Sequence, residues 1–235
     1  MIKCSIYHRN SLMKKINYVS FIAFTLAEVL ITLGIIGIVA EMTIPTLMNN
    51  VGDMELKAAW KKEFSAFSQV TTSLISDNGG DLINLCTSDI QGNCLRDAYG
   101  KYLKSTKSCD GNMYSVYGDC WHLLDGSASK WLNNTGVTAP GFIWRNEAGL
   151  MLADGSMVIF NWFQSDCQSG YGCGYMYFDV NGFKKPNVVG RDIFQVELHK
   201  DRLLPEGAQG TFASGQGCDA SSSGQACSAK YIYNN

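Results

Sequence analysis

The feature that most constrains this chain is a long apolar run near its N-terminus. Residues 24–47 read FTLAEVLITLGIIGIVAEMTIPTL. A helix of this length crosses a hydrocarbon core of about 30 Å, and Lys14 and Lys15 shortly before it predict a cytoplasmic N-terminus. A secretory signal peptide has a shorter apolar region followed by a small-residue cleavage site, which this run lacks. We therefore expect the segment to stay in the mature protein as a membrane helix.

One acid near the start of the run, Glu28, needs a separate explanation. An unpaired carboxylate inside a membrane helix is costly, by several kcal/mol. One interpretation is that its side chain reaches the membrane interface. Another is that it awaits a positive partner, such as a free α-amino group at Phe24 of a neighbouring chain. The second interpretation requires the chain to be cut between Ala23 and Phe24.

Residues 23–30, AFTLAEVL, resemble the prepilin processing motif of type IV pilins and type II secretion pseudopilins. In that family a short basic leader ends in a small residue, and the mature chain begins with Phe-Thr-Leu-x-Glu and an apolar helix. The resemblance implies that a prepilin peptidase cuts between Ala23 and Phe24 and methylates the new N-terminus at Phe24. It also implies that Glu28 is the assembly glutamate and that Pro45 kinks the helix.

Two residues differ from the family's usual pattern: Ala23 stands where Gly is commoner, and Ala27 where Ile or Val is commoner. The string MKK at residues 13–15 is similar to the usual start of such a leader, so we expect residues 1–12 to lie upstream of the true start. The family implies one span of the inner membrane with a cytoplasmic N-terminus, and later a periplasmic or cell-surface filament. Its partners would be the membrane, the peptidase, other filament subunits, and the assembly platform of a pilus or secretion machine.

Eight of the nine cysteines follow the apolar run, and only Cys4 precedes it. An even number beyond a membrane segment indicates disulfides in an oxidising compartment. Zinc is the alternative, but the chain has no C-x-x-C pair. Connectivity stays open at this point, although short spacings favour neighbours. The candidate pairs are Cys86–Cys94, Cys109–Cys120, Cys167–Cys173 and Cys218–Cys227.

The residues after the apolar run predict an amphipathic helix packed on a sheet. Apolar side chains recur at three- and four-residue steps up to the stop signal DNGG at residues 77–80. They are Trp60, Phe64, Phe67, Val70 and Leu74, and the charged residues Lys57, Lys61, Lys62 and Glu63 are expected on the other faces. Four strands follow, at about 150–153, 156–163, 174–180 and 193–198, the first two joined by a two-residue Asp-Gly turn.

This order predicts an α+β fold, in which a long N-terminal helix packs on a C-terminal antiparallel sheet. It matches the pilin-like architecture that the resemblance of the N-terminal motif implies. Short helical pieces are expected near 95–103 and 127–132, and the Gly- and Ser-rich tail is expected to be flexible apart from its cysteines. The expected parts are a leader 1–23, an apolar helix 24–48, an amphipathic helix 49–78, an irregular cysteine-containing region 79–140, a sheet 141–206 and a tail 207–235.

The string DVNGFKKPNVVGRD at residues 179–192 resembles a loop of pilin-like and pseudopilin-like subunits. One interpretation is a calcium site with Asp179, Asn181 and Asp192 as oxygen ligands. The other is turn chemistry, because Asn-Gly, Pro and Gly shape long hairpins. The spacing does not match an EF-hand, and three oxygen side chains are fewer than the six to eight ligands that calcium takes.

Composition and motifs argue against several classes of function. Formal net charge is −2, and the first 23 residues carry four basic and no acidic side chains, so the remainder is more acidic. An acidic body does not favour nucleic acid as the main partner. The body has two histidines, His122 and His199, and no G-x-S-x-G, H-E-x-x-H or phosphate-binding loop. We therefore expect a filament subunit rather than an enzyme. The alternative is a membrane-anchored extracytoplasmic binding module or adhesin that never polymerises.

Overall fold

The computed structural model describes residues 25–86, 92–111, 118–122, 125–138, 147–163, 166–167 and 172–233. The expected leader, including Ala23, and the expected new N-terminus Phe24 lie outside these residues. The chain divides into two units, Met1–Met48 and Asn49–Asn235, which we describe separately. We call the second unit the body.

The long helix α1 runs from Leu26 to Asp77 and so contributes to both units. Pro45 lies within its helical backbone, but the side chain of this residue is outside the described part, so the expected kink stays a prediction. The helix ends at Asp77, as the stop signal predicts, because Gly79 and Gly80 follow with φ of 88° and 118°.

Six strands form one antiparallel sheet in the order β1-β4-β5-β6-β7-β8. They are β1 (Ser105–Cys109), β4 (Ala148–Leu152), β5 (Met157–Phe163), β6 (Gly174–Asp179), β7 (Ile193–His199) and β8 (Arg202–Pro205). A separate two-stranded sheet joins β2 (Asp125–Lys130) to β3 (Gly136–Thr138). The predicted Asp-Gly turn connects β4 and β5, with Gly155 at φ 90°. The α+β prediction is confirmed.

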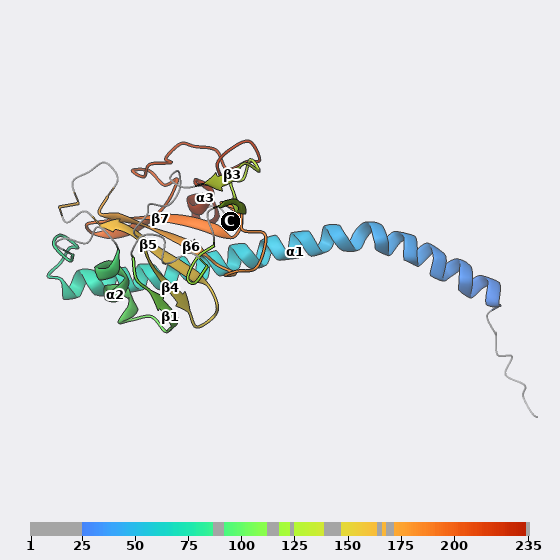
Figure 1. Ribbon diagram of the computed structural model, residues 1–235. Helices are drawn as coiled ribbons and strands as arrows, with labels where there is room; N and C mark the ends of the chain where they lie inside the picture. The colour runs from blue at the N-terminus through green and yellow to red at the C-terminus, as the bar shows by residue number, and fades with distance from the viewer. Residues whose placement is uncertain are drawn as a thin grey trace, which may run out of the picture. The chain divides into compact units, whose positions relative to one another are not determined.

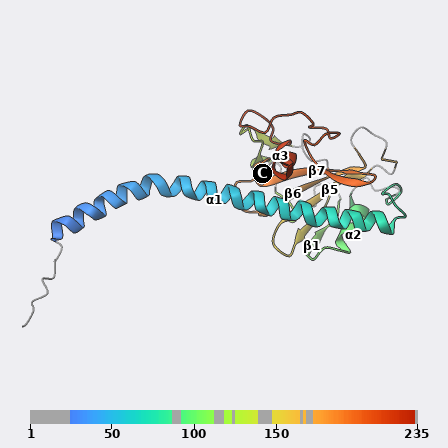
Figure 2. The ribbon, with the colours of Figure 1, turned by 180° about the vertical axis from the view of Figure 1, so that it is seen from behind.

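Both faces of the six-stranded sheet are covered. In the two opposite views, the body's part of α1 lies along one face (Figures 1 and 2). The side chains predicted to face the sheet pack there: Trp60 stacks on Phe194 with ring centroids 4.7 Å apart, and Phe67 meets Phe178 edge-on at 4.6 Å. Helix α2 (Asn93–Gly100) contacts β4 and β5. A second apolar cluster on the sheet comprises Trp121, Met157, Ile159, Tyr177, Val189 and Ile193.

Four predictions about the body are wrong in instructive ways. Residues 127–132, expected to contain a helical piece, lie mostly in strand β2. Strand β1 comes from the region expected to be irregular, and its sequence STKSC carries no apolar alternation that could have revealed it. Glu63, expected on a polar face, is buried. The tail ends in a helix, α3 (Cys227–Tyr233), which contacts β7 and β8.

Helix α3 is tied to α1 by Trp60 and by Lys57, whose Nζ lies 4.7 Å from the centroid of the Tyr231 ring. Trp60 is fully buried, and its Nε1 donates a hydrogen bond of 3.0 Å to the carbonyl oxygen of Ser228. Ser228 Oγ in turn accepts a hydrogen bond of 3.0 Å from the backbone N–H of Gln195 in β7. The first and last helices and the middle of the sheet therefore meet at one point.

Replacing Trp60 with alanine should lower the free energy of unfolding of the body by about 3–5 kcal/mol, because a large cavity opens beside Phe194. Trp60→Phe should cost about 1–2 kcal/mol, since a ring remains but the bond to Ser228 is lost. Urea unfolding of the oxidised body measures both values, with Lys61→Ala on the exposed side of α1 as a control. Equal losses for the alanine and phenylalanine variants would contradict the packing role of the ring.

Candidate functional site

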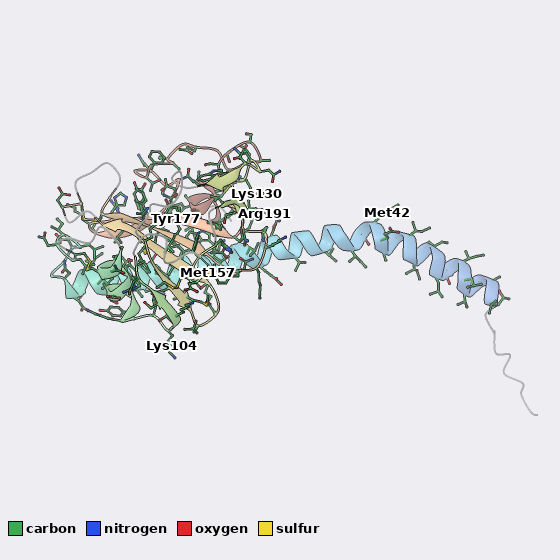
Figure 3. The ribbon with its side chains drawn as sticks, viewed as in Figure 1. Met42, Lys104, Lys130, Met157, Tyr177 and Arg191 are labelled. Carbon is green, nitrogen blue, oxygen red and sulfur yellow. A yellow bond between two sulfur atoms is a disulfide. The ribbon has the colours of Figure 1, made fainter. Side chains whose placement is uncertain are left out.

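The first unit presents the segment on which a membrane or assembly function would depend. Within the described part of the chain, one helical segment, Leu26–Ile44, is long and apolar enough to cross a membrane. Its apolar side chains project on every side and are all exposed, as Met42 illustrates (Figure 3). A helix that is apolar around its whole circumference is stable in lipid or when surrounded by other apolar helices.

Glu28 closes the N-terminal end of this segment. Its Oε2 accepts hydrogen bonds from the backbone N–H of Thr25 at 2.8 Å and from Thr25 Oγ1 at 2.9 Å. The backbone N–H of Glu28 donates to Thr25 Oγ1 at 3.2 Å. This reciprocal arrangement is a capping box, in which a Thr before the first helical turn and a Glu three residues later satisfy each other's backbone donors.

Sequence reasoning missed this cap, although the signal is present as Thr-x-x-Glu before an apolar run. The cap bears on the interpretation of Glu28, because it gives the carboxylate local hydrogen bonds that need no second chain. It does not supply a positive charge, however. The carboxylate remains an exposed anion at the start of a mostly apolar segment, whose other acid is Glu41.

The segment also carries small residues. A Cβ added at Gly34 or Gly37 would meet no atom within 4 Å, so another helix can approach the backbone there.

No protein-family model, curated protein or solved structure matches this chain.

Of the predicted calcium ligands, Asp179 ends β6, and Asn181 and Asp192 lie in the connection between β6 and β7. Both carboxylates accept hydrogen bonds. Asp179 Oδ2 lies 2.7 Å from His122 Nε2, and Asp179 Oδ1 accepts from the backbone N–H of Asn181. The two oxygens of Asp192 accept from the backbone N–H groups of Asn187 and Val188 at 2.7 and 2.6 Å. These bonds match the turn interpretation of the sequence.

The three side chains offer fewer oxygen ligands than the six to eight that calcium takes, although Asn181 Oδ1 is buried without a hydrogen-bond partner. The carboxylates of Asp179 and Asp192 bind N–H groups of the loop itself, and Asn181 Nδ2 holds the carbonyl oxygen of Lys185. Among the described residues, no group of three or more His, Cys, Asp or Glu is placed to hold a metal ion. Burial raises the pKa of Asp179 to about 7, against the lowering effect of the bond to His122. The two carboxylates hold the backbone of the residues between β6 and β7 through these hydrogen bonds.

The four disulfides join the same pairs that the spacings favour: Cys86–Cys94, Cys109–Cys120, Cys167–Cys173 and Cys218–Cys227. Each closes a loop of fewer than a dozen residues, so each stabilises the body by about 3 kcal/mol or less. Four disulfides indicate an oxidising compartment outside the cytoplasm. Together with the apolar segment, they are consistent with a membrane anchor or signal followed by an exported body.

Two buried glutamates hold the tail on the sheet. Glu197 Oε1 accepts from the backbone N–H of Phe212 at 2.6 Å, and Glu197 Oε2 lies 3.2 Å from His199 Nε2. Glu206 Oε1 accepts from the backbone N–H of Ala213. Burial first, and the nearby Glu197 carboxylate second, raise the pKa of Glu206 to about 7. The segment expected to be flexible is thus fixed by buried carboxylates as well as by a disulfide.

Proposed function

We propose that this protein is a pilin-like filament subunit, made as a membrane precursor, cut before Phe24 and assembled through its apolar helix. The observation that carries the proposal is Glu28, an exposed acid in the first turn of a segment, Leu26–Ile44, that is mostly apolar and holds a second acid, Glu41, near its other end. After the cut, the new α-amino group of one subunit would lie at the same depth as Glu28 of its neighbour. The attraction of these two charges would then set the register between subunits.

Several properties of the chain support this proposal. The motif at residues 23–30 resembles prepilin processing sites, and the body is a helix packed on an antiparallel sheet, as pilin-like subunits are. The bare backbone at Gly34 and Gly37 permits close helix packing. Identical subunits related by a rotation that does not close generate an open filament. A pilus and a secretion pseudopilus are both filaments of this kind.

A membrane-anchored binding module that never polymerises is the second candidate, and the capping box is the observation that favours it. In that case, Glu28 would serve only to begin the helix through Thr25. The anchor would remain in the membrane as a monomer. The two candidates differ in whether the charge of Glu28, rather than its hydrogen bonds, is needed.

The first test is processing and assembly in the organism that makes the protein. We expect mass spectrometry to find the mature chain beginning at Phe24, and a strain without prepilin peptidase to accumulate the uncut precursor. We also expect the mature protein in the filaments sheared from cells and seen by electron microscopy. Normal cutting in the peptidase-deficient strain would exclude the proposal. A cut protein that is never found in filaments would favour the monomeric anchor.

A further inference from the structure

The turn between β2 and β3 carries the chain's one Asn-x-Ser/Thr sequence, Asn133-Asn134-Thr135. The turn follows directly on Lys130 at the end of β2, which is labelled in Figure 3. All three residues are exposed. The backbone N–H of Asn134 donates to the carbonyl oxygen of Trp131, and Asn134 has φ 66°, a conformation that Asn tolerates. The sequence is thus displayed on a defined surface turn.

Within this turn, the first Asn and the Thr face each other. Asn133 Oδ1 accepts hydrogen bonds from Thr135 Oγ1 at 2.7 Å and from the backbone N–H of Thr135 at 3.1 Å. Among the described residues, none accepts a hydrogen bond from Asn133 Nδ2. The side-chain amide nitrogen and the threonine hydroxyl therefore lie on the same exposed turn, with the nitrogen accessible from solvent.

The same hydrogen bonds occur twice elsewhere in the body, where Asp154 accepts from Ser156 and Asp219 accepts from Ser221. The pattern itself is therefore a turn-forming device. A carboxylate occupies the first position in both of those turns, whereas Asn133 supplies an amide. Only the Asn133 turn combines an accessible amide nitrogen with a hydroxyl two residues later.

We infer that Asn133 is an acceptor site for an N-linked glycan. An amide nitrogen followed two residues later by Ser or Thr is the acceptor pattern for this modification, and it is found on surface loops of exported proteins. The four disulfides indicate that the body reaches an oxidising compartment, where its turns are exposed to membrane-bound glycosyltransferases. The inference concerns the exported body and does not depend on filament assembly.

The reaction would use a sugar carried on a lipid diphosphate as the donor. Asn133 Nδ2 forms a bond to the anomeric carbon of the sugar, and the bond from that carbon to the diphosphate oxygen breaks. The amide nitrogen loses one proton, and the diphosphate leaves on its lipid. No oxidant or reductant is needed. The product carries a bulky, hydrophilic group on the exposed turn.

The test is peptide mapping by mass spectrometry of the full chain, purified from the organism that makes it. We expect the peptide that contains Asn133 to carry a sugar mass, with unmodified peptide in the minority. Release of the glycan by a peptide N-glycosidase should convert residue 133 to aspartate. An unmodified Asn133 in this material overturns the inference, whether or not the protein is found in filaments.

Three variants in the same organism separate recognition of the sequence from the shape of the turn. Thr135→Val keeps the volume but removes the hydroxyl and should abolish the modification, whereas Thr135→Ser should retain it. Asn134→Gly suits the positive φ and leaves the acceptor pattern intact, so it should also retain the modification. A sugar that persists at the same level in Thr135→Val would overturn the assignment of Asn133.

Discussion

Replacing Glu28 with glutamine should abolish filament assembly while leaving the precursor in the membrane and the leader cut. The amide oxygen of glutamine can still accept the hydrogen bonds that Thr25 donates, so the start of the helix is preserved. The negative charge is lost, and with it the attraction to the α-amino group of a neighbouring subunit. Immunoblots of sheared filaments measure assembly, and blots of washed membranes measure insertion.

The matched variant is Thr25→Ala, which removes the two hydrogen bonds of Thr25 Oγ1, one to the Glu28 carboxylate and one from the Glu28 N–H, but keeps the charge. It should assemble, because the backbone N–H of residue 25 can still donate to the carboxylate. If Glu28→Gln forms filaments at the wild-type level, the charge is not needed and the capping box accounts for the acid. If only Thr25→Ala fails to assemble, the cap rather than the charge is the functional element.

The body should be more stable in mildly acidic solution than at pH 8. The pKa of Glu206 is about 7 in the folded body, because of burial first and the Glu197 carboxylate second, against an ordinary value of 4.5. Between these two values the folded state holds a proton that the unfolded chain releases. The contribution of the Glu206 carboxyl group to the unfolding free energy is therefore complete below about pH 4.5 and is lost as pH rises to about 7. The loss is on the order of 3 kcal/mol.

Glu206→Gln tests this dependence. Gln can accept the bond from Ala213 through its oxygen and donate to Glu197 through its nitrogen, and it has no proton to lose. We expect the variant to exceed the wild type in unfolding free energy at pH 8 and to approach it near pH 4.5. Urea unfolding across this range measures the slope. Glu55→Gln, the same change on an exposed turn of α1, should follow the wild-type curve. Parallel curves for Glu206→Gln and wild type would contradict the prediction.

Burial also raises the pKa of Glu63 to about 7, although Lys62 lies 3.6 Å from its carboxylate. Burial is also the largest cause of the raised pKa of Asp179. Both groups also make the unfolding free energy fall as pH rises. Glu206→Gln should therefore remove only part of the pH dependence of the wild-type unfolding free energy.

Local signals predicted the regular parts of the fold well. The stop after Asp77 and the turn at Gly155 depend on glycine conformations, and the apolar side of α1 around Phe67 follows from periodicity. The disulfide pairs followed from short spacings. These features are encoded within a few residues of each other, which is why a single sequence reveals them.

Long-range contacts explain what the sequence did not reveal. Strand β1 is polar because four of its five residues are exposed, so its place at the sheet edge comes from pairing with β4. Helix α3 lies in a Gly- and Ser-rich tail, and it is held by Trp60 and by Gln195, far away along the chain. Glu63 was assigned to a polar face by its charge alone, yet it is buried and interacts with Asp154 in the turn between β4 and β5. In each case a distant residue decides the environment.

The contact between Trp60 and Ser228 has a consequence for how the protein is made. The two residues are 168 positions apart, and the second lies a few residues from the last described residue. The pocket around Trp60 therefore closes only after the chain has been translated as far as Ser228. If the first helix holds a precursor in the membrane, as proposed, the body crosses as an open chain and folds on the far side, where its cysteines are oxidised. A chain that stops just before Ser228 would thus leave an unfinished core that is exposed to proteases.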